Sequence, residues 1–315
     1  MPETSRPTQM HFFADLDVEI LEQVDTVDET APPASLWHDA WQSLRVRPIF
    51  WVSAFLILLV VVVAAVPRLF TSTDPSYCDL MSSYNPPGPG HPFGFDRQGC
   101  DIYARTIYGA RASVTVGILT TIVVVVLGAV VGALAGFYGK WFDSLLSRIT
   151  DIFFAIPLVL AAIVVMQVFA THRNVFTVVV VLGVFGWPQI ARITRGAVMS
   201  VKNADFITAA TALGVSRSRN LIRHVMPNAA APIIVTATVS LGIFIVAEAT
   251  LSFLGIGLPT TIVSWGADIA KAQAALRTQP SVLFYPAGAL ALTVLSFIMM
   301  GDAVRDALDP KARKR

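Results

Sequence analysis

Long runs of apolar residues, separated by shorter polar segments, dominate the chain from residue 49 onward. A helix needs roughly 20 mostly apolar residues to cross the hydrocarbon core of a bilayer. Helices and closed barrels are the structures that satisfy their backbone hydrogen bonds there. Six stretches are long and apolar enough, and we expect spans at residues 49–66, 114–137, 152–170, 175–193, 229–254 and 282–300. The pattern predicts an all-α membrane protein with six transmembrane helices.

The fourth stretch has the shortest uninterrupted apolar run, from Val175 to Trp187. To reach residue 193, the helix must pass through Pro188, which lacks a backbone donor and clashes with the preceding turn. We therefore expect a bend at Pro188. The first stretch follows 48 residues rather than a short basic leader, which favours a membrane anchor over a secretory signal peptide.

Charge predicts the orientation of the spans. Eight of the 21 acidic residues lie within the first 29 positions, and this composition predicts a largely disordered tail over residues 1–36. Cytoplasmic loops carry an excess of Lys and Arg. With both termini inside the cell, seven of the 23 basic residues are external: Arg68, Arg97, Arg105, Arg111, Arg173, Lys271 and Arg277. This asymmetry favours a cytoplasmic lead-in at 37–48, a membrane domain at 49–310 and a basic cytoplasmic end at 311–315.

The predicted topology gives an external loop at 67–112 and a cytoplasmic segment at 199–228. Both cysteines, Cys78 and Cys100, lie in the external loop, where they either form a disulfide or remain two free thiols. The five histidines fall on different sides of the membrane and lack the spacing of metal ligands. Neither a catalytic motif nor a phosphate-binding loop is present. We therefore expect no catalytic, cofactor or metal site, and a lipid rather than a nucleic-acid environment.

Two features inside the predicted spans stand out. Gly128, Gly132 and Gly136 recur at every fourth position, which predicts a smooth strip for close helix packing. Glu248 is an ionisable residue within the fifth span, where an unpartnered charge is costly. Either it lines a passage through the membrane, or it is hydrogen-bonded to a neighbouring helix or to the loop that follows.

The segment at 199–228 predicts two short helices. Asn203 or Asp205 can cap the first, Gly214 suits a left-handed residue at its end, and Ser216 can cap the second. Apolar residues at helical spacing share one face of the first helix, and the small alanines let that face enter a groove on another protein. These residues are Phe206, Ala209, Ala210 and Leu213.

This segment resembles the EAA loop of ABC-importer permeases. Thr208-Ala209-Ala210 is followed by Gly214 and by Arg223-His224-Val225-Met226-Pro227-Asn228, with Thr208 in place of the usual glutamate. The His91–Asp96 stretch, the run from Glu248 to Gly255 and the tripeptide Ser264-Trp265-Gly266 are similar to motifs of the same family. Together they resemble the C-type permease of dipeptide, oligopeptide and nickel importers over most of residues 45–310.

The resemblance implies a type I ABC-importer permease fold and a multi-pass subunit of a bacterial inner membrane. It implies a second, B-type permease, two ABC ATPase domains that bind the ATP, and an external substrate-binding protein. The expected ATPase contacts are Asp205, Phe206, Thr208, Ala209, Ala210, Leu213, Gly214, Val215 and Arg219. Cargo is expected to be di- or oligopeptides. The alternatives are an ion-gradient-driven secondary transporter, or an importer of nickel chelates or haem.

Overall fold

The computed structural model describes residues 36–308, and these residues form helices joined by loops, without a regular strand. Predictions about the acidic tail and the basic C-terminal end fall largely or wholly outside the described residues. The main helices are α2 Leu36–Arg45, α3 Pro48–Ala65, α4 Ile102–Tyr138, α5 Lys140–Ala155, α6 Leu158–Val168, α7 Val175–Gly186, α8 Pro188–Val201, α9 Asp205–Ala212, α10 Arg217–Asn220, α11 Met226–Asn228, α12 Ala230–Phe253, α13 Trp265–Ala272 and α14 Ser281–Leu308.

Helices long and apolar enough to cross a membrane lie at the predicted places. Within the described residues, α3, α4, α12 and α14 qualify as single helices. The pairs α5/α6 and α7/α8 qualify together, which gives up to six spans if each bent pair is one span. The α7/α8 pair is bent by 46° at a break followed by Pro188, and this confirms the predicted bend.

The prediction of one continuous third span at 152–170 is wrong. α5 ends at Ala155 and α6 begins at Leu158, and the two helices meet at an angle of 81°. The cause is Pro157, because a proline disfavours the helical conformation of the residue before it. Ile156 is accordingly extended, with φ −87° and ψ 119°. α6 alone has 11 residues, so its length of about 16 Å is well short of the hydrocarbon core.

The predicted external loop at 67–112 is shorter in the structure, because α4 begins at Ile102 rather than near residue 114. Asp101 is the N-cap, and its Oδ1 accepts a hydrogen bond from the backbone N–H of Ala104 at 2.8 Å. This bond satisfies one of the free donors of the first turn. With 37 residues, α4 is about 55 Å long and exceeds the thickness of a bilayer.

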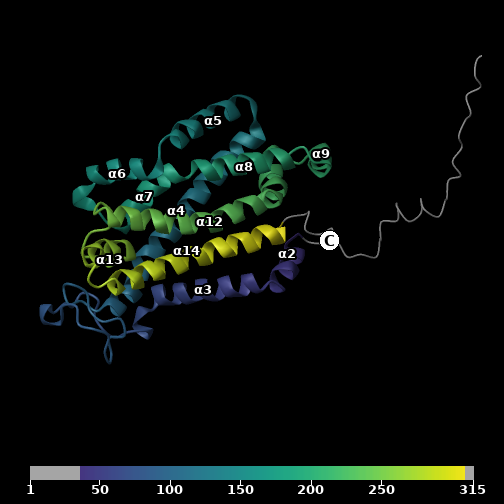
Figure 1. Ribbon diagram of the computed structural model, residues 1–315. Helices are drawn as coiled ribbons and strands as arrows, with labels where there is room; N and C mark the ends of the chain where they lie inside the picture. The colour runs from purple at the N-terminus through teal and green to yellow at the C-terminus, as the bar shows by residue number, and fades with distance from the viewer. Residues whose placement is uncertain (1–35, 309–315) are drawn as a thin grey trace, which may run out of the picture.

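The helices run between two distinct ends of the molecule (Figure 1). Residues 66–101 and α13 lie at one end, which we call the disulfide end. α2, α9 and the last turns of α14 lie at the other, which we call the α9 end. An ion pair between Arg47 and Asp306, with 2.7 Å from N to O, joins the start of α3 to the end of α14. α4 connects the two ends through the middle of the bundle.

The glycine strip on α4 packs against α8, as predicted. A Cβ added to Gly132 would lie 2.3 Å from the backbone oxygen of Ala191, and one added to Gly128 would lie 2.6 Å from Ile190 Cβ. Any side chain on these faces would therefore push the helices apart. Small residues on one helix let the backbones approach closely, so the strip makes α4 and α8 one tightly packed pair.

Candidate functional site

α9 is attached to the bundle by one face and leaves an apolar face uncovered. Ile207 is 5% exposed and packs with Val198 of α8 and with Leu221 and Val225. In contrast, Phe206 is 49% and Leu213 86% exposed. Large apolar side chains exposed together on an anchored helix are typical of a surface that binds another protein.

The C-terminal end of α9 is closed by a Schellman motif centred on Gly214. The N–H of Gly214 donates to the carbonyl of Thr211 at 3.0 Å, and the N–H of Val215 donates to that of Ala210 at 3.1 Å. Gly214 has φ +86°, in the left-handed region that glycine adopts without a steric penalty. The predicted role of Gly214 at the helix end is confirmed.

The predicted N-cap position is right for Ser216 and wrong for the start of α9. Ala204, rather than Asn203 or Asp205, occupies the N-cap of α9, and its side chain makes no capping hydrogen bond within the described residues. Asp205 lies in the first turn instead, where its negative charge favours the positive end of the helix dipole. Ser216 is at the N-cap position of α10, but its hydroxyl accepts no capping bond from the described chain.

Asn220 holds α10 against α9, which no local sequence pattern predicts. Its side chain is 2% exposed, and its Nδ2 donates to Thr211 Oγ1 at 2.9 Å. Asn220 follows two arginines and a serine, so its polarity suggested a solvated surface. The hydrogen bond instead crosses nine positions and sets how the two short helices pack.

The second predicted helix is present, and it contains a π-helical turn. α10 is followed by a π-helical turn, Leu221–Val225, in which the N–H of Met226 donates to the carbonyl of Leu221. α11 then carries Pro227 close to its start, where the missing N–H costs little. Arg217, Arg219 and Arg223 are exposed along this part of the segment. The assignment of Arg219 to an ATPase contact stays a prediction.

Two ion pairs attach α8, the helix that leads into α9, to α5. Arg195 makes a bidentate pair with Asp143, with N–O distances of 2.5 Å and 2.8 Å. Arg192 pairs with Asp151 at 2.7 Å. Neither pair was predicted from the sequence. Asp143 and Asp151 are eight positions apart, so both lie on nearly the same face of α5. α8 is thus held by α4 on one side and by α5 on the other.

Glu248 lies inside the chain rather than on a surface. It is 0% exposed, and the hydroxyl of Ser252 donates to its Oε1 at 2.7 Å. Its other carboxylate oxygen, Oε2, has no hydrogen-bond partner within the described residues, and neither has the hydroxyl of Ser113 on α4. The bond to Ser252 lies within α12 itself, so both alternatives, a lining of the passage and a hydrogen bond to a neighbouring helix or to the following loop, stay untested predictions.

At the disulfide end, Cys78 and Cys100 form a disulfide bond. The backbone is also hydrogen-bonded next to the disulfide, since the N–H of Asp79 donates to the carbonyl of Gly99 at 3.1 Å. The structure thus has the bonded form of the two open alternatives. Disulfides persist in oxidising compartments, so this bond fits a loop outside the cytoplasm.

Comparisons with known proteins agree with these features. The family model "Binding-protein-dependent transport system inner membrane component" matches residues 128–314. A second model, "N-terminal TM domain of oligopeptide transport permease C", matches residues 35–87. Together the two models cover both the predicted coupling segment and the first span.

Curated relatives match over most of the chain. The oligopeptide transport system permease protein OppC of Bacillus subtilis is 38% identical, over 89% of this chain and 91% of the relative. The dipeptide transport system permease protein DppC of Alkalihalophilus pseudofirmus is 34% identical, over 91% and 96%. The glutathione transport system permease protein GsiD of Escherichia coli O157:H7 is 36% identical, over 88% and 91%.

A solved structure, the inward-facing MetNI methionine ABC transporter, has a chain of the same fold. It matches with a TM-score of 0.55 and 19% identity, over 65% of this chain and 96% of that chain. The fold is therefore that of an ABC-importer permease. From the family models, the relatives and this fold together, the chain belongs to the family of inner membrane components of binding-protein-dependent transport systems.

Proposed function

We propose that this chain is one of two permease subunits of an ATP-driven importer of di- or oligopeptides in a bacterial inner membrane. It forms half of the translocation pathway, and the second permease forms the other half. Peptide cargo is supported by relatives named for oligopeptide, dipeptide and glutathione transport, which favours peptides over nickel chelates or haem. An external binding protein delivers the cargo.

The observation that carries the proposal is the uncovered apolar face of α9. Phe206 and Leu213 are exposed on a short helix whose other side is anchored through Ile207. A partner that covers these side chains gains the free energy of burying them, about 1.5–3 kcal/mol for a fully buried side chain. An ABC ATPase domain that grips α9 can then move it as a rigid element, since both the Schellman motif and the Asn220 bond hold its shape.

The proposal also sets the orientation. The disulfide end faces outside the cell, where an oxidising environment maintains the Cys78–Cys100 bond. The α9 end faces the cytoplasm, where ATP is available to the partner ATPase domains. Because α2 and the end of α14 lie at the α9 end, this orientation puts both termini inside the cell.

A matched pair of substitutions tests the docking role of α9. Leu213→Ala removes an exposed side chain, so we expect the free energy of unfolding of the purified chain to change by less than about 0.5 kcal/mol. ATP-driven uptake by the reconstituted importer should nevertheless fall about tenfold, as for loss of an interface anchor. Ile207→Ala empties a buried site instead, and it should lower the free energy of unfolding by about 2–5 kcal/mol.

Stability and uptake are measured on the same preparations, with Ala212→Ser on the same helix as a neutral control. If Leu213→Ala leaves uptake and co-purification with the ATPase unchanged, α9 is not the docking element.

The energy source is tested in sealed vesicles that contain this chain and the second permease. We expect peptide uptake with ATP, the ATPase subunits and the binding protein, and none with an ion gradient alone. Uptake driven by an ion gradient without the ATPase would contradict the proposal. Competition by short peptides, but not by nickel chelates or haem, would establish the cargo class.

A further inference from the structure

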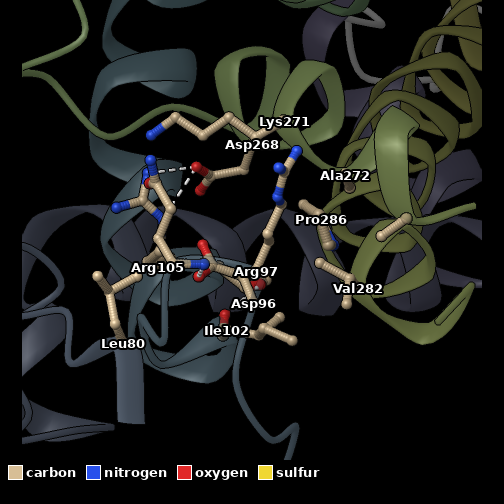
Figure 2. Close-up of a pocket in the computed structure, with 13 residues that line it drawn as sticks. Leu80, Asp96, Arg97, Ile102, Arg105, Asp268, Lys271, Ala272, Val282 and Pro286 are labelled. Atoms are coloured by element: carbon tan, nitrogen blue, oxygen red, sulfur yellow. Dashed lines mark hydrogen bonds and ion pairs between the residues drawn. The ribbon is translucent and has the colours of Figure 1, made fainter. Parts of the chain in front are cut away.

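A cavity of 410 Å³ lies at the disulfide end (Figure 2). Its walls come from four separate parts of the chain: the disulfide-closed loop, the first turn of α4, α13 and the start of α14. None of these four parts lies at the α9 end. The cavity is large enough for one or two amino-acid residues of a ligand, within the range of small-molecule sites.

One carboxylate oxygen in the cavity is buried without a partner. Asp268 of α13 is 9% exposed, and its Oδ1 accepts hydrogen bonds from Nε of Arg105 at 2.9 Å and from an NH2 group of the same guanidinium. The Oδ2 of Asp268 has no hydrogen-bond partner within the described residues. A buried acceptor without a donor costs about 1–3 kcal/mol, so a ligand that supplies an N–H would remove this cost.

The guanidinium of Arg105 is committed to the protein. Besides Asp268, it donates through NH1 to the carbonyl of Pro75 at 3.1 Å. Asp96 is committed through one oxygen only: its Oδ1 accepts from the backbone N–H groups of Gln98 at 2.8 Å and Cys100 at 2.9 Å, while its Oδ2 makes no hydrogen bond with the described residues. Both residues are part of the cavity wall, and only Arg105 is fully engaged by protein groups.

Two cationic side chains are available to a ligand. Lys271 of α13 and Arg97 of the disulfide-closed loop line the cavity. Neither side chain makes a hydrogen bond or a close ion pair with the part of the chain that the structure describes. Burial, together with the guanidinium of Arg105, lowers the pKa of Lys271, and the carboxylates of Asp268 and Asp96 partly offset this shift. An anion bound here would favour the charged ammonium group.

The opposite wall is apolar. Ile102 is 5% and Val282 7% exposed, and Pro286 is buried in the first turns of α14. Figure 2 shows Pro286 and Val282 on the other side of the cavity from the Arg105–Asp268 pair, with Arg97 reaching in from the loop. The cavity thus presents two cations, two carboxylate oxygens without a hydrogen bond, Oδ2 of Asp268 and Oδ2 of Asp96, and an apolar surface.

We propose that this cavity binds the free carboxyl end of a short peptide. The terminal carboxylate lies between Lys271 and Arg97, the last peptide N–H donates to Asp268 Oδ2, and an apolar terminal side chain packs on Ile102, Val282 and Pro286. Charge-assisted bonds to a carboxylate are about twice as strong as neutral ones. The inference rests on the proposed function for the peptide class and for the external position of the cavity.

Direct binding to the purified importer complex, in detergent and without the binding protein, tests the proposal. The probes are Ala-Ala-Leu, its carboxy-terminal amide and its N-acetyl derivative, measured by calorimetry up to millimolar concentrations. We expect the free-acid peptide to bind and the amide to bind at least about tenfold more weakly, because the charge is lost. N-acetylation should change the affinity less than twofold.

Variants separate the site from general effects on folding. Lys271→Gln should weaken binding of the free-acid peptide about tenfold, while Lys271→Arg should restore most of it because the charge is kept. Arg277→Gln removes a charge after α13 that does not line the cavity, and it should leave binding unchanged. Melting temperatures of all three variants should match that of the native chain.

The outcomes also separate this inference from the proposed function. If no free-acid peptide binds, but ATP-driven peptide uptake with the binding protein persists, the cavity assignment is overturned and the permease function stands. Equal binding of acid and amide overturns it too. If Lys271→Gln weakens only association of the binding protein, the cavity is a protein contact instead. Loss of peptide uptake under every condition would count against the proposed function itself.

Discussion

The two ends of this molecule are built in opposite ways. The disulfide end is held by internal bonds: the Cys78–Cys100 disulfide, the Arg105–Asp268 ion pair and the Asp101 cap at the start of α4. The α9 end instead exposes large apolar side chains at Phe206 and Leu213. The disulfide end also exposes apolar side chains, Leu80 at 76% and Met81 at 89%. The difference therefore lies in how each end is held: by covalent and buried ionic bonds at the disulfide end, and by apolar packing of a short helix at the α9 end.

The difference shows where shape is fixed in advance and where it is completed by assembly. In the proposed orientation, the disulfide end lies outside the cell and receives cargo, so it must keep its form without a partner, and its covalent and buried ionic bonds provide this. A segment that is moved by another subunit needs a rigid shape of its own and an uncovered face. α9 has both, through the Schellman motif at Gly214 and the anchor at Ile207.

Among the changes that test the contrast between the two ends, loss of the disulfide should have the largest effect on stability. The two cysteines are separated by 22 positions, and opening a loop of this size costs about 3 kcal/mol in the chain-entropy description. We expect Cys78→Ser with Cys100→Ser to lower the melting temperature and to increase amide hydrogen exchange over residues 78–100. Exchange in α9 should stay the same.

If residues 78–100 of the double variant are as protected from amide hydrogen exchange as those of the native chain, the contrast between the two ends is removed. Mass spectrometry of the non-reduced native chain provides the control, since free thiols at both positions would show that the bond is absent.

Gly132→Ala should have the second largest effect, because it disturbs the α4–α8 contact that connects the two ends. The added Cβ would lie 2.3 Å from Ala191 O, and overpacking of this kind costs about 1–3 kcal/mol. Gly196→Ala on α8 is the matched control, because a Cβ there has no neighbour within 4 Å. It should stabilise the helix by about 0.5–1 kcal/mol. Thermal unfolding in detergent measures the stability of both variants. Equal stabilities of the two variants would contradict the close packing of α4 against α8.

Gly214→Val should have a smaller effect on stability and a large one on transport. A β-branched residue in the left-handed conformation costs about 1–2 kcal/mol, enough to unwind the last turn of α9. Membrane insertion should be normal, while ATP-driven uptake should fall sharply. Gly214→Asn, which tolerates positive φ better, should retain more uptake. Normal uptake by the valine variant would sink the view of α9 as a rigid element.

The smallest effect is expected for Asp306→Asn at the α9 end. The Arg47–Asp306 pair is 33% and 61% exposed at its two side chains, and ion pairs in water of this kind contribute about 0–1 kcal/mol. The change in stability should disappear at high salt, because screening weakens the native pair as well. A larger loss of stability that does not depend on salt would mean that ionic bonds hold the α9 end as firmly as the disulfide end.

Much of the fold could be predicted from local features of the sequence. The apolar runs located the spans, Pro188 located the bend, and Gly214 located the end of α9, because each depends on residues within a few positions. Pro157 carried the same kind of signal as Pro188, and overlooking it produced the wrong third span. Asp101 before Ile102 likewise marked the true start of α4.

The pairings between distant residues could not be predicted in this way. Arg105 and Asp268 are 163 positions apart, and Arg195 and Asp143 are 52 apart. Which arginine meets which carboxylate depends on which helices are neighbours. The same holds for the buried Asn220 and for Ile207, whose burial no local pattern indicated.

By itself, the sequence determined that the chain enters a membrane as helices, where those helices bend and how α9 ends, because hydropathy and backbone conformation are local properties. Only the tertiary structure decided which face of α9 is left uncovered and which charges share a cavity at the disulfide end. These depend on the packing of segments far apart in the chain, and packing is a property of the whole bundle.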